Sequence, residues 1–183
     1  RFVVFSQNHD QIGNRAVGDR LTAHVELDAL KAAAATVLLG PNVPLLFMGE
    51  EYGESAPFQY FVDHSDTHLI DAVRSGRRQE FVAFGWEESQ IPDPQDVATF
   101  TRSRLRRQVN ANQEALWSWY RALIALRKEM KKLGTAVTTE QHQAWCLEEE
   151  RVLMLHRWDE KESDQMLVVI SFNPSTVMVS LHK

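Results

Sequence analysis

The densest group of side chains that could do chemistry lies between residues 8 and 15. It includes the adjacent pair His9 and Asp10, and it directly follows residues 2–5, an apolar run of strand-forming types. Sites in parallel sheets and barrels are built where strands end, so an imidazole beside a carboxylate could here bind sugar hydroxyls, support an oxocarbenium-like charge or help to hold a metal. A polar turn in which Asn8 and Asp10 bond the backbone would use the same residues. Local chemistry leaves both interpretations open.

Two further carboxylates, Glu50 and Glu51, follow a second apolar run at residues 44–48. Neighbouring residues point to opposite sides of an extended chain and diverge by about 100° on a helix, so these two cannot readily flank one bond as a catalytic pair. We therefore expect one of them to close a hydrogen-bond network and the other to face solvent or a distal sugar.

A third polar cluster holds Asp63, His64, Asp66 and His68. Oxygen and imidazole ligands suit a divalent metal, but this spacing matches neither an EF-hand loop nor a His-Glu-x-x-His pair. A loop that shapes a ligand site, or a helix N-terminus capped by Asp66 or Thr67, explains the cluster more simply. No metal and no cofactor are predicted, and the sequence has neither a phosphate-binding glycine loop nor a Gly-x-Ser-x-Gly elbow.

The elements that would position these residues follow from the hydrophobic pattern. Residues 2–5 and 44–48 each predict a short buried strand. Between them, residues 25–39 predict a helix, which Gly40 and Pro41 end. This order predicts a parallel βαβ unit with polar residues gathered at the carboxyl ends of both strands.

Helices also dominate the middle of the sequence. They are predicted over residues 69–84, 97–107 and 113–131, the last with Asn112 as its N-cap. The apolar stripe of the long helix is assigned to packing, and it consists of Leu116, Trp117, Trp119, Tyr120, Leu123, Ile124 and Met130.

Beyond Gly134 the pattern changes to short strand-like runs separated by acidic turns. The predicted strands cover residues 144–147, 152–158, 166–172 and 177–181. Such spacing predicts an antiparallel meander. We place the domain boundary near residues 132–139, which gives domains at 1–133 and 134–183.

The composition narrows the class of protein. With 20 Lys+Arg against 25 Asp+Glu in 183 residues, the formal net charge is −5. This negative charge disfavours nucleic acid as a partner. The arginines between residues 102 and 107 fit a solvated helix face. The apolar stretches at residues 32–39 and 43–48 are both shorter than the roughly 20 residues of a membrane span, so no membrane partner is predicted. The single cysteine, Cys146, is predicted to be a small buried hydrophobe in a reducing, cytoplasmic compartment.

Two motifs resemble those of a known enzyme group. Residues 5–10, Phe-Ser-Gln-Asn-His-Asp, resemble the strand-seven signature of the α-amylase clan of glycoside hydrolases. Residues 47–51, Phe-Met-Gly-Glu-Glu, resemble that clan's strand-eight ending. Three longer segments are similar to the clan's trehalohydrolase family, which acts on malto-oligosyltrehalose, and they cover residues 8–21, 57–64 and 76–81. The likeness runs through the long helix and weakens in the β region.

The resemblance implies an α/β fold, namely the last two βα units of a (β/α)₈ barrel followed by part of an antiparallel β domain. It also implies a parent enzyme that cleaves the α-1,4 bond of malto-oligosyltrehalose and releases trehalose with retention. Asp10 matches the clan's transition-state stabiliser, and His9 matches a hydroxyl-binding partner in the same subsite. Further sugar contacts are assigned to the side chains of Asn8, Gln11, Arg15, Glu50 and Tyr60.

The clan's nucleophile and acid/base follow strands four and five, which would lie before Arg1. Because retaining hydrolysis needs both carboxylates, we expect this chain to be the back end of a longer protein and inactive by itself. Uncovered strand edges predict self-association. Two alternatives stay open: another enzyme of the clan, such as a branching, debranching or amylase-type protein, and a noncatalytic carbohydrate-binding or assembly module.

Overall fold

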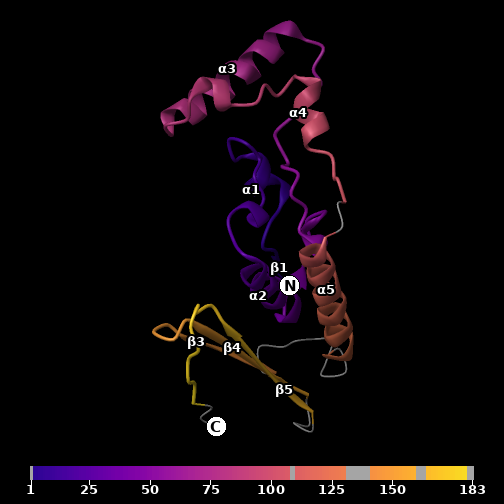
Figure 1. Ribbon diagram of the computed structural model, residues 1–183, viewed down its shortest axis with the longest axis vertical. Helices are drawn as coiled ribbons and strands as arrows, with labels where there is room; N and C mark the ends of the chain where they lie inside the picture. Colours follow the sequence, from indigo (N-terminus) through magenta and orange to yellow (C-terminus); the bar gives the residue numbers. More distant parts are fainter. Residues whose placement is uncertain (1, 108–109, 131–140, 160–163, 181–183) are drawn as a thin grey trace. The chain divides into compact units, whose positions relative to one another are not determined.

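The computed structural model describes residues 2–107, 110–130, 141–159 and 164–180 (Figure 1). The chain forms two compact units, each built from separate stretches of sequence. The first, which we call the sheet unit, contains residues 1–6, 27–45 and 115–183. The second, which we call the helical unit, contains residues 7–26 and 46–114.

A pair of parallel strands lies at the start of the sheet unit. β1 (Val3–Val4) pairs with β2 (Val43–Pro44), with Val3 opposite Val43. Two backbone N–H···O=C bonds of 3.0 and 2.9 Å join the strands. The predicted parallel pairing is confirmed, but β1 is shorter than the run at residues 2–5 and β2 shares only Pro44 with the run at residues 44–48. The prediction that both strands are buried was wrong, since Val3 and Val43 are exposed.

Helix α2 (Leu27–Leu39) precedes β2 in the chain and makes the crossover between these strands. Its four consecutive alanines are strong helix formers, and their small side chains let neighbouring elements approach closely. The helix ends before Gly40 and Pro41 as predicted, and it begins two residues after the predicted start at residue 25.

The C-terminal end of α2 is held by Arg127 on helix α5 (Ala111–Met130). One terminal guanidinium nitrogen donates to the carbonyl oxygens of Leu38 and Gly40 over 2.5 and 2.8 Å, and the other donates to that of Asn42 over 2.6 Å. The last carbonyls of a helix have no partner within it, so a multidentate donor is needed at this point. Arg127 thereby fixes the end of α2 and the approach to β2.

Replacement of Arg127 by methionine removes these donors and nearly keeps the side-chain length. We expect the free energy of unfolding to fall by about 2 kcal/mol, because the bonds from a charged donor are lost and the carbonyls stay partly buried. The urea midpoint checks this, with Lys128→Met at an exposed neighbouring position of α5 as the control. Equal midpoints for the two variants would contradict the role of Arg127.

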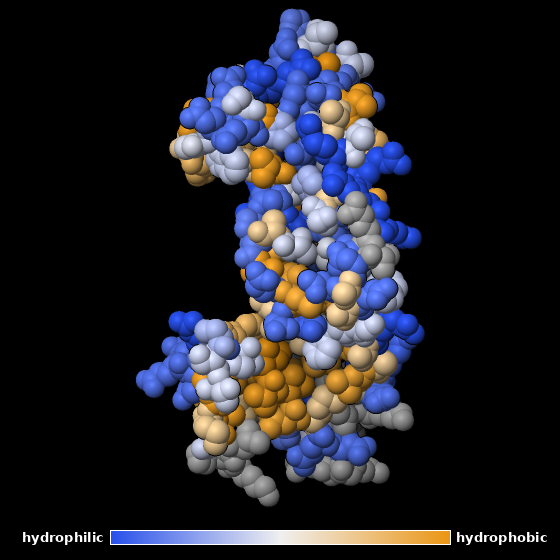
Figure 2. Space-filling model, in the orientation of Figure 1, coloured by the Kyte–Doolittle hydropathy of each residue, from blue (hydrophilic) through white to orange (hydrophobic). Residues whose placement is uncertain are grey.

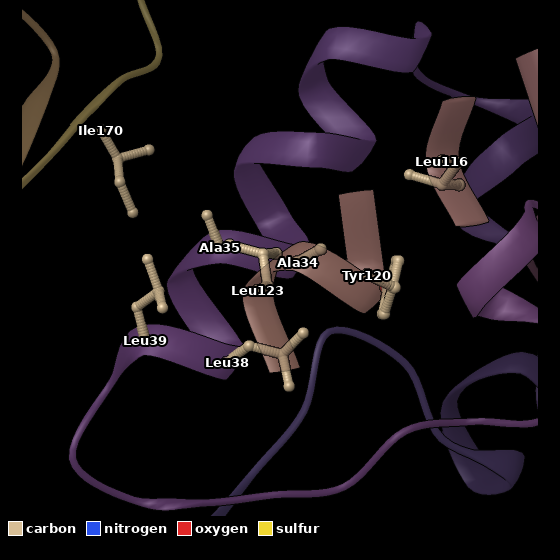
Figure 3. Close-up of a cluster of buried hydrophobic side chains, with 8 residues drawn as sticks. All are labelled: Ala34, Ala35, Leu38, Leu39, Leu116, Tyr120, Leu123 and Ile170. Carbon is tan, nitrogen blue, oxygen red and sulfur yellow. The ribbon is translucent and has the colours of Figure 1, made fainter. Parts of the chain in front are cut away.

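The main hydrophobic core lies in the sheet unit (Figure 3). Its buried members are Ala34, Ala35, Leu38 and Leu39 of α2, Leu116, Tyr120 and Leu123 of α5, and Ile170 of the sheet. The spacing of the α5 members puts them on one helix face, as the predicted stripe requires. Trp117 and Trp119 lie off that face and are exposed, and the indole N–H of Trp119 donates to the carbonyl of Lys31 over 2.9 Å. Their assignment to the packed stripe was therefore wrong.

A three-stranded antiparallel sheet completes the sheet unit. Its order is β3 (His142–Leu147), β4 (Val152–Trp158) and β5 (Gln165–Ser171), so the predicted meander is confirmed for these strands. Cys146 is exposed, contrary to the prediction, because it lies on β3 at the edge of the sheet.

The predicted fourth strand is wrong over residues 177–180, which are not in a strand. β-forming residue types need a partner strand to form a ladder, and propensity alone does not supply one. Leu181 and the predicted domain boundary at residues 132–139 lie outside the described residues. The division into domains 1–133 and 134–183 therefore stays a prediction.

A hydrophobic groove of about 290 Å³ also lies within the sheet unit. It is lined by Val4 and Phe5 beside β1, by the end of α2, and by sheet residues that include Leu153 and Ile170. Figure 2 shows a broad hydrophobic area beside the sheet. Phe2, Val3 and Val43 are exposed as well, so the parallel pair leaves apolar surface uncovered.

The helical unit contains the short helix α1 (His9–Gly13) and the helices α3 (Thr67–Ala83) and α4 (Val97–Arg102). It also contains three 3₁₀ turns: η1 (Leu21–Ala23), η2 (Glu50–Tyr52) and η3 (Glu88–Gln90). None of the helices in the described part of the chain is long and apolar enough to cross a membrane.

The ends of the helices agree with the predicted boundaries at some residues and differ from them at others. Asp66 accepts the N–H groups of the first turn of α3, as predicted for this residue. α4 ends at Arg102, so the prediction of a helix to residue 107 was wrong. Asn112 is not the N-cap of α5, because the helix begins at Ala111, and Asn110 accepts the N–H of Gln113 over 3.0 Å instead.

Candidate functional site

Asp10, predicted to be catalytic, and His9, predicted to bind the sugar, lie on α1, which follows β1 in the chain. The side chain of Asn8 caps this helix by accepting the N–H of Gln11 over 2.7 Å, so the turn interpretation was right for Asn8. The side chains of His9 and Asp10 are instead 73% and 74% exposed, with His9 Nε2 3.3 Å from Asp10 Oδ1. Both are open to a ligand, and Gln11 beside them is also exposed.

The backbone after α1 is fixed by close contacts. The N–H of Leu21 donates to Gln7 Oε1 over 2.8 Å. Gly18 has a φ of +66°, and a Cβ at this position would lie 2.4 Å from the carbonyl oxygen of Phe58. The N–H of Phe58 donates to the carbonyl of Gly18 over 2.7 Å. Glycine is required at residue 18, because any side chain would separate these two backbone segments.

Arg15 belongs to a surface cluster with Asp19 and His24. The guanidinium of Arg15 donates to Asp19 Oδ2 over 2.7 Å, and the same nitrogen lies 2.8 Å from His24 Nε2, which also contacts Asp19. Desolvation acts to raise the pKa of Asp19, but the hydrogen bonds from Arg15 and His24 outweigh it and lower this pKa. Arg15 therefore presents a fixed, partly neutralised cation at the surface.

The carboxylates after β2 differ in burial. Glu50 is 5% exposed, whereas Glu51 is partly exposed and accepts the N–H of Gly49 over 2.9 Å. The predicted contact residue Glu50 thus lies in the protein interior of the helical unit, unlike His9 and Asp10.

Glu54 is a buried carboxylate that the sequence analysis missed. It is 1% exposed, and its oxygens accept the N–H groups of Ala56 and Arg106 over 2.8 and 2.7 Å and the hydroxyl of Tyr52 over 3.1 Å. Burial acts to raise the pKa of Glu54, but these bonds together with that from the N–H of Arg107 lower it. Desolvation and the bond to Glu54 raise the pKa of Tyr52 to about 12.

Arg20 is the second residue that the sequence analysis missed. Its side chain is buried, donates to the carbonyls of Ala56 and Met48 over 2.7 Å each, and lies with its guanidinium 4.9 Å from the ring centroid of Phe47. Desolvation lowers its pKa, while the charge of Glu54 acts in the opposite direction. Arg20 thus holds the segment after β2 to the loop after α1, and Glu54 holds the same segment to residues 106 and 107 after α4, so both are structural within this unit.

Tyr60 is the exposed member of an aromatic segment. Phe58 and Phe61 pack edge to face with each other at 6.0 Å and extend a chain of rings that also contains Phe47 and Phe100. Tyr60 is 39% exposed, and its ring centroid lies 4.8 Å from the guanidinium carbon of Arg77. Of the aromatic residues in this segment, Tyr60 is thus the one that a sugar ring could contact.

The polar cluster at residues 63–68 stabilises the loop before α3 and the start of that helix. The N–H of His64 donates to Gln95 Oε1 over 3.2 Å, Gln95 donates back to the carbonyl of His64 over 3.0 Å, and Asp66 caps α3. Within the described ranges, no group of three or more histidine, cysteine, aspartate or glutamate residues could hold a metal ion.

Comparison with known proteins gives a consistent set of relatives. Over 135 residues the chain is 50% identical to the malto-oligosyltrehalose trehalohydrolase of Arthrobacter ramosus, a match that covers 71% of this chain and 23% of the relative. The enzyme of the same name from Rhizobium sp. (strain M-11) is 47% identical, a match that covers 78% of this chain and 25% of the relative. That from Saccharolobus solfataricus is also 47% identical, and the match covers 70% of this chain and 21% of the relative. The chain belongs to the malto-oligosyltrehalose trehalohydrolase family. No family model matches the chain.

Solved structures agree with this trehalohydrolase assignment at the level of the fold. A Salmonella typhimurium protein, provisionally assigned as an α-amylase, superposes with a TM-score of 0.85 at 35% identity and covers 100% of this chain and 31% of that protein. A trehalulose synthase superposes with a TM-score of 0.51 at 21% identity, covering 93% of this chain and 34% of the synthase. The predicted fold class is confirmed: the chain holds the last βα units of an α-amylase-type barrel, followed by an antiparallel β region.

The chain spans about a quarter of the length of the curated relatives that it matches. The structure brings His9 and Asp10 together on α1 and places Arg15 just after that helix. Glu50 is buried in the segment after β2. Arg77 links the ring of Tyr60 to the carbonyl of Gly13 at the end of α1, and the preceding residues Phe58 and Gln59 bond the carbonyls of Gly18 and Val17.

Proposed function

We propose that this chain supplies part of the sugar site of a retaining glycoside hydrolase that acts on malto-oligosyltrehalose and releases trehalose. One observation carries the proposal: the exposed His9–Asp10 pair lies on a capped turn that follows a strand in a parallel pair. Active sites of barrels are built at this end of the strands. The identity of 37% to 50% to the named trehalohydrolases supports this choice of substrate.

In this proposal Asp10 stabilises the positive charge that develops on the sugar ring in the transition state. An ionised carboxylate suits this task, because the transition state of glycoside cleavage resembles an oxocarbenium ion. His9 donates to a hydroxyl of the same sugar, and Tyr60 stacks on a neighbouring ring. Polar contacts with the oligosaccharide are assigned to Asn8, Gln11 and Arg15, whereas the predicted contact of Glu50 is dropped because its side chain is buried.

The nucleophile and the acid/base belong, in this proposal, to preceding strands of the full-length enzyme. Retaining cleavage needs two carboxyl groups about 5 Å apart across the scissile bond. Glu50 and Glu51 do not meet this requirement, since one is buried and the other accepts a backbone N–H in its own turn. We therefore expect the 183-residue chain alone not to cleave the bond and to bind sugars weakly or not at all.

Chromatography of the products from malto-oligosyltrehalose tests the proposal. We expect the full-length enzyme to release trehalose and the 183-residue chain alone to release none above the background. Trehalose release by the chain alone would contradict the division of the catalytic set. A full-length enzyme that cleaves maltodextrin but not malto-oligosyltrehalose would instead favour the amylase-type alternative, which the Salmonella typhimurium relative supports.

The remaining parts of the proposal concern location and partners. A cytoplasmic location is inferred from the single cysteine, and no metal, cofactor, nucleic acid or membrane takes part. Self-association of the isolated chain is proposed from the exposed apolar residues at β1 and β2, which include Phe2 and Val43.

A further inference from the structure

Arg77 connects α3 to the segment that carries the His9–Asp10 pair. Its guanidinium donates to the carbonyl oxygen of Gly13 over 3.1 Å and to that of Arg15 over 3.5 Å. Gly13 is the last residue of α1, a helix of five residues, and so short a helix is marginal without outside contacts. The cation satisfies the carbonyl of Gly13, which the helix leaves open at its C-terminal end, where positive charge is also favoured. The carbonyl of Arg15 lies beyond the helix and also accepts the N–H of Gly18.

The same guanidinium contacts two aromatic rings. Its central carbon lies 4.8 Å from the ring centroid of Tyr60 and 4.7 Å from that of Phe81. Phe81 is buried in a small core with Ala16 and Ile91, whereas Tyr60 is exposed. Arg77 is thus anchored on its inner side by a buried ring, and it supports an exposed ring on the rim of the proposed site.

We propose that Arg77 is a positioning residue, which sets the spacing between the exposed ring of Tyr60 and the helix that carries His9 and Asp10. This inference rests on the proposed function, because it assigns those three side chains to one sugar site. Displacement of a reacting or stabilising group by about 1 Å can cost a hundredfold in rate, so a residue that fixes this spacing has a measurable kinetic effect.

The role requires the planar guanidinium of arginine, of which one terminal nitrogen donates to both carbonyls. A guanidinium can face aromatic rings and donate in its plane to two carbonyl oxygens at once, whereas an ammonium is a compact point charge. Burial lowers the pKa of Arg77, and the nearby groups of Glu80 and Tyr60 partly offset this effect. The guanidinium nevertheless stays charged, since arginine does not lose its proton in proteins.

Steady-state kinetics of the full-length enzyme with malto-oligosyltrehalose test the inference. We expect Arg77→Met to lower kcat by about tenfold or more, because Asp10 acts mainly in the transition state, and to raise KM, because Tyr60 loses its support. Arg78→Met is the matched control: this arginine lies next to Arg77 on α3, is exposed and pairs with Glu88 over 3.3 Å. We expect that variant to stay within about twofold of the unmodified enzyme.

A double-variant cycle separates positioning from simple loss of stability. In a Tyr60→Leu background we expect Arg77→Met to leave KM unchanged, because the ring that it supports is gone, but still to lower kcat through Asp10. A merely structural role would reduce the fraction of active enzyme, which lowers kcat and leaves KM unchanged in both backgrounds. An unchanged KM in the Arg77→Met single variant, or additive effects of the two changes on KM, would therefore overturn the inference.

Arg77→Lys covers the case in which Arg77→Met does not fold. It keeps the charge and the aliphatic stem, and we expect it to fold and still to lose about tenfold in kcat. Kinetic constants of Arg77→Lys equal to those of Arg78→Met would overturn the positioning role while the proposed function stands. Failure of the unmodified full-length enzyme to release trehalose would overturn the proposed function itself, and the inference with it.

Discussion

Replacement of Asp10 by asparagine is expected to lower kcat/KM of the full-length enzyme for malto-oligosyltrehalose by about 10²- to 10³-fold. Asparagine has nearly the same size as aspartate, but it carries no charge to stabilise an oxocarbenium-like transition state. The effect should fall on kcat, with KM changed by less than about threefold, because the charge on the sugar develops only as the bond breaks. Initial rates of trehalose release over a range of substrate concentrations give both constants.

The control makes the same chemical change where no role is proposed. Asp28 on α2 is a fully solvated carboxylate, 95% exposed, whose neighbour is Lys31. Asp28→Asn should leave both kinetic constants within about twofold, since isolated surface ion pairs contribute little. If Asp10→Asn keeps more than about a third of the unmodified kcat/KM, Asp10 is not the transition-state stabiliser.

Sequence reasoning found the elements whose signals are local. The run of alanines and the Gly40–Pro41 stop define α2, and they lie within the helix or next to it. Asn8 and Asp66 cap their helices through N–H groups two or three residues away, so the sequence shows both partners at once. The exposed pair of His9 and Asp10 was found for the same reason, because its polar residues follow an apolar run directly.

The buried polar groups were missed because their partners are distant in the sequence. The donors to Glu54 include backbone N–H groups 52 and 53 residues later, and Arg20 donates to a carbonyl 36 residues away. No pattern of residue types marks such backbone partners. The predicted burial of Cys146 and of the tryptophans of α5 was wrong for a different reason. These residue types are often buried, but here Cys146 lies at a sheet edge and the tryptophans lie beside the packed face of the helix.

Glu54 gives the largest expected effect on stability. In Glu54→Gln one side-chain oxygen becomes an NH₂ group, which cannot accept the N–H of Ala56 in one orientation or that of Arg106 in the other. We expect the free energy of unfolding to fall by about 3 kcal/mol, because a buried donor is left without an acceptor. Urea midpoints of the full-length protein at neutral pH measure this loss. Glu51→Gln is the control, with an expected loss of less than about 1 kcal/mol, since Glu51 is partly exposed and bonds one N–H.

The pH dependence of this difference identifies the carboxylate as its cause. Burial acts to raise the pKa of Glu54, but its hydrogen bonds outweigh burial and hold the folded-state pKa below the ordinary value of 4.5. The unfolded chain therefore takes up a proton first as the pH falls, so the ionised group stabilises the fold above pH 4.5 and this contribution is lost toward the folded-state pKa. Glutamine does not titrate, so the gap between the urea midpoints of the unmodified protein and Glu54→Gln should be constant above about pH 5.5 and narrow below pH 4.5. A gap that stays constant down to pH 3, or one no larger than that of Glu51→Gln at neutral pH, would show that the charge of Glu54 does not stabilise this network.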